Sequence, residues 1–179
     1  MYAAAGGFPD VVEHLVKSGA SVTKRHQQGG DALMEAATSG NISVINTLME
    51  HGADPLVLDN DAVTTLMSSA AQGHLEASKI FMDRGVKVNF VAKSGGTAIM
   101  FAAGKGHTEV TRLLLDAGAE VNIVVRATPE YLEQVAEAIA EGKEGVEPHT
   151  DGVTALVVAA QGGYLDCVKM LVEAGAEVR

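Results

Sequence analysis

The chain has 179 residues, of which 47% are hydrophobic and 20% charged, and this composition excludes an intrinsically disordered protein. A formal net charge of −10 disfavours nucleic acid and anionic membranes as partners, because like charges repel. The sequence has neither a signal peptide pattern nor an apolar run of about 18 residues, and its single cysteine, Cys167, cannot form an internal disulfide. We therefore expect an intracellular protein, cytoplasmic or nuclear and not secreted.

A period of 33 residues organises the chain from its first residues onward. Gly7, Gly40, Gly73 and Gly106 are 33 residues apart, and Gly163 follows Gly106 by 57, which is one period plus an insertion of 24 residues. After each of these glycines, apolar residues recur at helical spacing and end at a second glycine, which indicates a helix with a glycine at its C-terminal end. The expected repeats, each a helix-turn-helix unit, cover about 1–25, 26–58, 59–91, 92–122 and 149–179, and the insertion covers 123–148.

The repeats resemble those of the ankyrin family. The resemblance rests on Gly-x-Thr-Ala-Ile-Met-x-Ala-Ala from Gly95 to Ala103, on Gly106-His107-Thr108-Glu109-Val110, and on their recurrence in phase along the chain. It implies an all-α fold, an ankyrin-repeat solenoid of about five helix-turn-helix repeats with short hairpin loops and one helical insertion. By the same resemblance, the chain is expected to bind another protein and not to be an enzyme.

Two departures from the family pattern bear on stability. The family's Thr-Pro-Leu-His sequence at the start of the first helix has neither its proline nor its histidine here, as in Thr97-Ala98-Ile99-Met100. Since that histidine ties neighbouring repeats together in the family, we expect apolar packing to carry more of the contact between repeats. Ala62 replaces the usual turn glycine, so its hairpin is expected to be strained by on the order of 1 kcal/mol if the backbone there has positive φ.

The insertion differs in composition from the repeats. Thr128-Pro129 is a typical helix start and Gly142 a typical stop, so we expect an amphipathic helix over about 129–141. Its apolar stripe includes Tyr131, and its acidic stripe comprises Glu133, Glu137 and Glu141. The apolar stripe either packs on the repeats or docks a partner, and the acidic stripe is either a solvated face or a surface for a basic partner.

No pattern of catalytic or metal-binding residues emerges from the sequence. The six histidines form no ligand-spaced cluster, and Asp59-Asn60-Asp61 lacks the glycine and the glutamate of a calcium loop, which favours a hairpin tip. Cys167 lies in an apolar phase of its helix and is interpreted as a buried structural thiol. We expect no catalytic residues, no cofactor and no bound metal.

By resemblance to the family, partner binding falls to the hairpin tips and to the exposed sites of each first helix, on the concave face. The expected partner-binding residues are Gln27, Gln28, Thr38, Ser39, Asn60, Asp61, Gln72, Lys93, Ser94, Phe101, Lys105 and Gln161, with Tyr131, Glu133, Glu137 and Glu141 of the insertion. Phe101 is a candidate aromatic anchor or a cover for the insertion helix.

The function expected is therefore that of a protein-protein interaction scaffold or adaptor with a protein partner, basic if it binds the acidic insertion. The alternatives are a regulatory ankyrin domain of a larger enzyme or channel, and small-molecule binding under the insertion helix. Met1 falls in register with Met34, so the chain starts inside a repeat and is expected to be a fragment. The last repeat lacks a polar cap, and end-to-end self-association through the terminal repeats is a further hypothesis.

Overall fold

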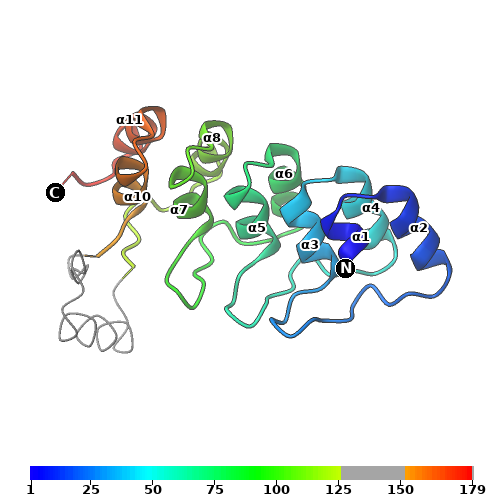
Figure 1. Ribbon diagram of the computed structural model, residues 1–179. Coiled ribbons are helices and arrows are strands. Elements are labelled where there is room, and N and C mark those ends of the chain that lie inside the picture. The colour runs from blue at the N-terminus through cyan, green and yellow to red at the C-terminus, as the bar shows by residue number, and fades with distance from the viewer. Residues whose placement is uncertain (126–151, 179) are drawn as a thin grey trace, which may run out of the picture.

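The computed structural model describes residues 1–125 and 152–178, and within them ten helices form two stacked layers (Figure 1). The first helix of each repeat lies in an inner layer, next to the hairpin loops. The inner helices are α1 (Tyr2–Ala5), α3 (Ala32–Ser39), α5 (Thr65–Ala71), α7 (Ala98–Ala103) and α10 (Ala155–Gln161). The outer helices are α2 (Pro9–Lys17), α4 (Ile42–Glu50), α6 (Leu75–Asp83), α8 (Thr108–Asp116) and α11 (Leu165–Glu173).

Each layer is a continuous row, because every helix contacts its counterpart in the next repeat. The inner row runs through α1, α3, α5, α7 and α10, and the outer row through α2, α4, α6, α8 and α11. The hairpin loops all project from the same side of the inner row (Figure 1). The prediction of an all-α solenoid of helix-turn-helix repeats is confirmed for the described residues.

The helices start and stop where the sequence provides caps. The side chains of Asp31, Thr64 and Thr154 accept hydrogen bonds from backbone N–H groups in the first turns of α3, α5 and α10, which satisfies donors that the helix leaves free. After each outer helix the chain turns at a glycine with φ between 82° and 90°, as at Gly52 and Gly118. Glycine adopts this conformation without a Cβ clash, so the chain leaves the helix sharply.

Small residues let the inner helices approach one another closely. Ala36, Ala37, Ala70, Ala102 and Ala103 are fully buried between them. In the second, third and fourth repeats, one large aliphatic residue of the inner helix is buried in the core: Leu33, Leu66 and Ile99. The methionine that follows each of them is also buried, at Met34, Met67 and Met100. The core is therefore one continuous apolar layer that extends from repeat to repeat.

From α4 onward, the N-cap residue of each outer helix packs against the turn glycine of the preceding repeat. Asn41, His74, His107 and Tyr164 lie over Gly7, Gly40, Gly73 and Gly106, all of which have positive φ. A Cβ on Gly73 would lie 2.5 Å from Nδ1 of His107, closer than any real Cβ contact, so this contact needs a glycine. We call each such pair, an N-cap side chain and the turn glycine that it covers, an inter-repeat contact. It occurs at the same two positions at every junction between described repeats.

Three of these inter-repeat contacts also carry a hydrogen bond, which the sequence did not predict. Nε2 of His74 lies 3.0 Å from the carbonyl oxygen of Thr38, Nε2 of His107 lies 3.2 Å from that of Ala71, and Nδ2 of Asn41 donates to the carbonyl oxygen of Gly7 at 2.9 Å. Repeats are thus tied by polar groups as well as by apolar packing, although from a different position than the histidine that the family usually uses.

Ala62 has φ of 58° and is the only non-glycine residue with positive φ in the described part of the chain. Its counterparts in the other hairpins are Gly29, Gly95 and Gly152, with φ of 83°, 83° and 81°. An L-residue pays a steric cost in this region, so the strain expected from the sequence is present in the folded chain.

Replacing Ala62 by glycine is expected to raise the free energy of unfolding by about 1 kcal/mol, because the strain is relieved. The measurement is urea unfolding followed by circular dichroism. Ala117→Gly is the control: Ala117 is exposed and has φ of −84°, so its replacement brings no relief. Equal changes in the two variants would contradict the assigned strain.

Gly73→Ala is expected to destabilise the chain more than Gly85→Ala. Both glycines have positive φ, but a Cβ on Gly85 meets nothing within 4 Å, whereas one on Gly73 overlaps His107. The difference in unfolding free energy should be about 1–3 kcal/mol, the range for overpacking. Adding His107→Ala should remove most of the extra cost in a double-mutant cycle, and an additive double variant would rule out the clash.

Candidate partner-binding surface

Each hairpin is closed by backbone hydrogen bonds at its base. The amide of His26 donates to Gly30 at 2.9 Å, that of Asp59 to Val63 at 3.2 Å, and that of Ala92 to Gly96 at 2.9 Å, always onto the carbonyl oxygen. These bonds fix the conformation of the tips, and they confirm that Asp59-Asn60-Asp61 belongs to a hairpin.

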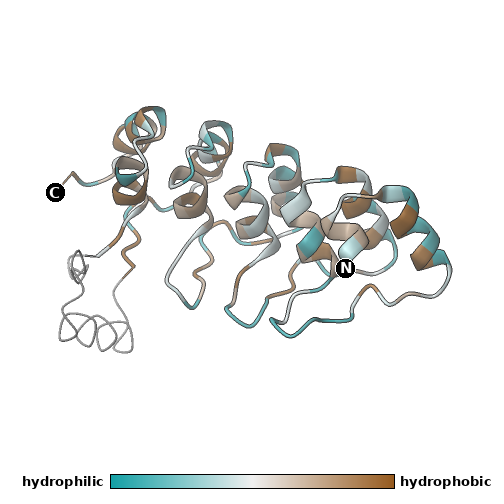
Figure 2. Cartoon of the chain, viewed as in Figure 1, coloured by the Kyte–Doolittle hydropathy of each residue, from teal (hydrophilic) through white to brown (hydrophobic). Residues whose placement is uncertain are grey.

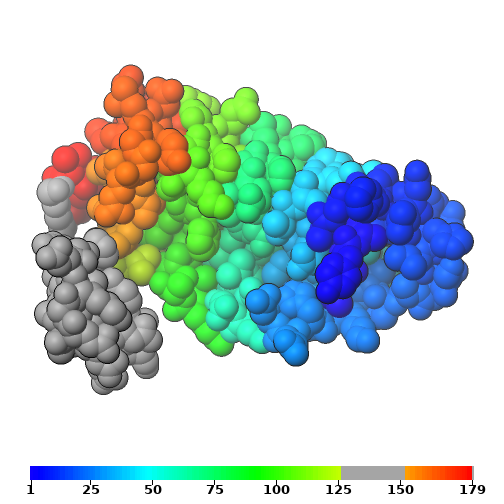
Figure 3. Space-filling view, in the orientation of Figure 1, coloured from blue at the N-terminus to red at the C-terminus, as the bar shows by residue number. Residues whose placement is uncertain are grey.

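Neighbouring hairpins are also bonded to each other. The amide of Asn60 donates to the carbonyl oxygen of Gln28 at 2.8 Å, and the amide of Lys93 donates to that of Asp61 at 2.9 Å. Two side chains reinforce this ladder: Nδ2 of Asn60 donates to the carbonyl oxygen of Gln27 at 2.8 Å, and Nζ of Lys93 donates to that of Asn60 at 2.6 Å. The first three tips therefore form one tied row, continuous with the inner helices in the space-filling view (Figure 3).

The predicted partner-binding residues of the repeats all lie at the surface of this row or of the inner helices. Exposed residues are Gln27, Gln28, Thr38, Asn60, Asp61, Gln72, Lys93, Ser94, Lys105 and Gln161, and Ser39 and Phe101 are half-buried. The polar side chains fall into three groups by what they bond. Asn60 and Lys93 tie hairpins together, and Thr38, Ser39 and Ser94 bond to the backbone of their own repeat. No side-chain hydrogen bond within the described part of the chain is made by the others: Gln27, Gln28, Asp61, Gln72, Lys105 and Gln161.

Phe101, the candidate aromatic anchor, is half-buried. It packs against the core, and its ring covers Gly96 at the base of the same repeat's hairpin, where an added Cβ would lie 2.9 Å from Cζ. Because Phe101 is not fully buried, it offers some apolar area on this surface.

The remaining predicted residues, Tyr131, Glu133, Glu137 and Glu141, lie outside the described residues, as does the predicted helix over 129–141. The structure does show where the chain leaves and rejoins the stack. The amides and carbonyl oxygens of Val125 and Val153 exchange two hydrogen bonds of 2.8 and 2.9 Å, in the place where the other hairpins are closed. The insertion is thus attached at a hairpin tip.

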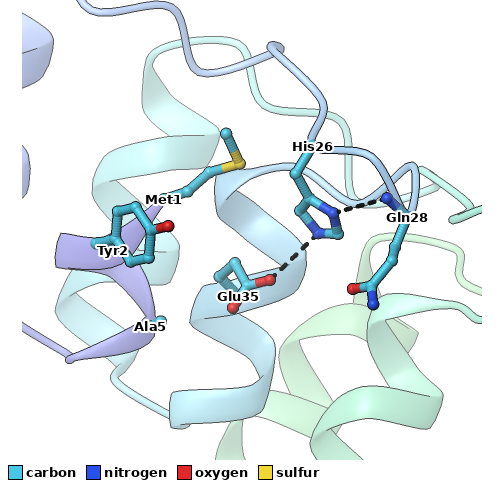
Figure 4. A pocket seen from close by; sticks show the side chains of 6 residues that line it. All are labelled: Met1, Tyr2, Ala5, His26, Gln28 and Glu35. Atoms are coloured by element: carbon cyan, nitrogen blue, oxygen red, sulfur yellow. Dashed lines mark hydrogen bonds and ion pairs between the residues drawn. The ribbon is translucent and has the colours of Figure 1, made fainter.

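A hollow of about 210 Å³ lies between α1, α3 and the first hairpin, lined by Met1, Tyr2, Ala5, His26, Gln28 and Glu35 (Figure 4). Nδ1 of His26 accepts a hydrogen bond from the amide of Gln28 at 3.1 Å, so Nε2 carries the proton in the neutral ring and lies 3.3 Å from Oε1 of Glu35. The hollow is smaller than a typical ligand pocket. The approach of His26 to Glu35 was not predicted, because spacing alone does not bring residues 26 and 35 together.

The described residues contain no group of three or more His, Cys, Asp or Glu side chains placed to hold a metal ion. Cys167 is fully buried, and its Sγ lies 3.7 Å from Oγ1 of Thr111. This placement agrees with a structural thiol. None of the helices within residues 1–125 and 152–178 is long and apolar enough to cross a membrane.

Asp31 is the buried carboxyl beneath the first hairpin. Only 3% of its surface is exposed, and Oδ1 accepts hydrogen bonds from the amides of Leu33 at 2.9 Å and Met34 at 3.1 Å. Burial raises the pKa of Asp31, because the charged form loses its water, and the two backbone hydrogen bonds lower it only in part.

Comparison with protein families places repeats of one type along the stack. A family model described as ankyrin repeats in three copies matches residues 1–59 and 33–125, and a single ankyrin repeat matches residues 151–179. A search of curated proteins found no match to the chain.

Asp31→Asn is expected to stabilise the chain near neutral pH and to lose this advantage below about pH 4, the ordinary pKa of Asp. Asparagine can accept the same capping bonds without a buried charge. Because the folded-state pKa of Asp31 is raised, the folded chain holds the proton more tightly than the unfolded chain, and stability falls as pH rises through that pKa.

Urea unfolding at both pH values measures the difference, and Asp61→Asn at an exposed tip controls for the loss of one charge. A less stable Asp31→Asn variant near neutral pH would show that the carboxylate charge is favourable at the helix start.

Proposed function

Because the chain belongs to the ankyrin repeat family, whose repeats are generally protein-protein interaction modules, we propose that it is a scaffold or adaptor that binds a partner protein along its hairpin tips and inner helices. Repeat proteins of this kind are typically non-catalytic binding modules. The observation that carries the proposal is that the hairpin backbones are hydrogen-bonded to one another, whereas several of the side chains at the tips make no hydrogen bond.

The hairpin backbones are committed to one another, while many of their side chains remain unbonded. The ladder through Gln28, Asn60, Asp61 and Lys93 holds the tips in a fixed row. A fixed row lowers the entropy that binding must overcome, because the contacting backbone is ordered before the partner arrives. Side chains such as Gln27 can then contact a partner without any loss to the fold.

The chemistry of the surface favours a polar partner contact with a small apolar centre. Amide side chains at Gln28, Gln72 and Gln161 can both donate and accept hydrogen bonds, and the exposed edge of Phe101 supplies apolar area. A basic partner remains our proposal for the acidic insertion, whose segment 123–150 carries a charge of −4 in the sequence.

The test places two new cations on the proposed surface. Thr38→Arg with Gln72→Arg changes two exposed positions of the inner row, one in α3 and one at the C-cap of α5. Ser43→Arg with Asn46→Arg adds the same charge to exposed positions of α4 in the outer row. Proteins retained from a native lysate are identified by mass spectrometry, and the dissociation constant of a retained protein is then measured with all three chains. We expect the inner pair to weaken binding by about tenfold or more, through bulk and unpaired charge at the interface.

The outer pair should leave the dissociation constant unchanged. Equal losses in the two double variants, or an unaffected inner pair, would contradict binding along the hairpin tips and inner helices. Circular dichroism of both double variants confirms that each remains folded before binding is compared.

A further inference from the structure

The turn that ends an outer helix has a carbonyl oxygen and an amide that together bind one carboxamide group. Nδ2 of Asn89 donates to the carbonyl oxygen of Gly118 at 3.0 Å, and its Oδ1 accepts a hydrogen bond from the amide of Glu120 at 2.9 Å. Asn89 belongs to the preceding repeat, so its side chain ties two repeats together. We call the backbone pair, the carbonyl oxygen of this glycine and the amide two residues later, a carboxamide notch.

The arrangement recurs one repeat later. Asn122 bonds to the carbonyl oxygen of Gly175 at 3.1 Å and to the amide of Glu177 at 3.0 Å. Both asparagines stand four residues after the glycine that ends the outer helix of their own repeat. A carboxamide fits because it carries a donor and an acceptor side by side, as the notch does. Carboxamide binding is thus a property of the turn itself and not of one particular pair of repeats.

Two further carboxamide notches lie inside the stack, and no side chain of the described residues occupies them. Their backbone groups are the carbonyl oxygen and the amide of Gly52 and Asp54, and of Gly85 and Lys87. None of these four groups makes a hydrogen bond within the described part of the chain. The positions that asparagine holds at the filled notches are held here by Thr23 and Leu56. Neither residue carries a carboxamide, so both notches are open.

The open notches have the backbone geometry of the filled ones. Gly52 and Gly85 have φ of 89° and 88°, against 82° and 90° for Gly118 and Gly175. In all four turns, the amides of the glycine and of the next residue donate to carbonyl oxygens in the last turn of the outer helix. A Cβ on Gly52 or Gly85 would meet nothing within 4 Å, so a side chain can approach. The same donor and acceptor are therefore presented to solvent.

Leu56 stands between the two open notches. It follows Asp54 of the first notch by two residues, and it has the position from which Asn89 reaches the turn of the next repeat. Its side chain is 54% exposed. Figure 2 shows such hydrophobic stretches on the chain that leads into the hairpins, whose tips are mainly hydrophilic. An exposed apolar side chain thus separates two polar notches.

We propose that the two open notches bind a partner segment that carries asparagine or glutamine at two positions three residues apart. Neighbouring repeats are about 10 Å apart, the packing distance of adjacent helices. A polyproline II segment has three residues per turn and rises about 3.1 Å per residue, so every third side chain lies on one face, about 9 Å further along. Two carboxamides of such a segment match the two notches, and its apolar residues lie against Leu56.

This site goes beyond the surface proposed above, because its residues belong to the turns after the outer helices and not to the hairpin tips or inner helices. The hydrogen bonds of one notch replace bonds to water, so one carboxamide alone gains little affinity. A second carboxamide on the same segment binds at a high effective concentration once the first is in place. Recognition therefore depends on both carboxamides in register.

The probe is the peptide Pro-Pro-Gln-Pro-Pro-Gln-Pro-Pro, whose prolines favour polyproline II. Two-dimensional NMR of the nitrogen-labelled chain follows the backbone amide signals as peptide is added. We expect the signals of Asp54 and Lys87 to move and saturate with a dissociation constant in the millimolar range, whereas that of Glu120, whose notch is filled, stays in place. Replacing both glutamines by glutamate, which has no N–H donor, should weaken binding about tenfold or more.

Two substitutions fill one notch at a time. Leu56→Asn provides a side chain for the notch at Lys87, and Thr23→Asn provides one for the notch at Asp54. Each should abolish the response of its own amide and weaken peptide binding about fivefold or more, since one of two contacts is lost. Leu56→Ala and Thr23→Ala are the matched controls: neither fills a notch, so the signals of both amides still move.

Filling is checked without peptide, because a hydrogen-bonded amide exchanges its hydrogen with solvent more slowly. The amide of Lys87 should exchange more slowly in the Leu56→Asn chain than in the Leu56→Ala chain. Equal exchange rates would show that this turn does not bind a carboxamide, and the proposal would then be wrong.

Three further results would overturn it: amides of Asp54 and Lys87 that do not respond to the peptide, an equal response to the glutamate peptide, or a Leu56→Asn chain that binds the peptide as well as Leu56→Ala does. Thr38→Arg with Gln72→Arg should leave peptide binding unchanged. The result is therefore independent of whether the hairpin tips and inner helices bind a partner.

Discussion

The stacking of one repeat on the next is the constraint on which the rest of the structure depends. A single helix pair of this length cannot bury its apolar residues alone, so each repeat is completed by its neighbours. The inter-repeat contact shows how narrow the tolerance is, because a methyl group on Gly73 would already collide with His107. Fixing the repeat spacing in this way also brings successive hairpins within hydrogen-bonding distance, and the surface proposed for partner binding is a consequence of that spacing.

Much of the fold could be predicted from the sequence because its 33-residue period is visible there. Glycines at a constant interval, together with apolar residues at helical spacing between them, predicted the helix pairs and their turns. Ala62 illustrates this reasoning: alignment showed that it replaces a turn glycine and predicted strain if the backbone there has positive φ, and the folded chain has φ of 58° at this residue. The structure thus shows that the backbone conformation of the turn is kept even where its glycine is replaced.

Contacts between repeats were harder to infer, since they depend on how far one unit is displaced and rotated relative to the next. His107 belongs to the residues that carry the resemblance to the family, but its bond to the carbonyl oxygen of Ala71, 36 residues earlier, requires the stacked geometry. For the same reason, Asn60 and Lys93 were grouped with the binding residues, although their side chains join hairpins. Sequence alone identifies which side chains reach the surface better than it identifies what they bond there.

The paired backbones of Val125 and Val153 give the array a place where chain length is nearly free to vary. Each of the other hairpins in the described residues closes over three residues, whereas this pair closes over residues 126–152. For a flexible segment in general, a ninefold increase in length adds only about 2 kcal/mol to the entropic cost of closure. The two hydrogen bonds keep Val125 and Val153 together, so the helices on either side are placed in the same way whatever the length of the chain between these residues. A segment of new composition can therefore be gained, lost or exchanged at this tip while the register of the repeats is preserved, which makes it a natural graft point in the stack.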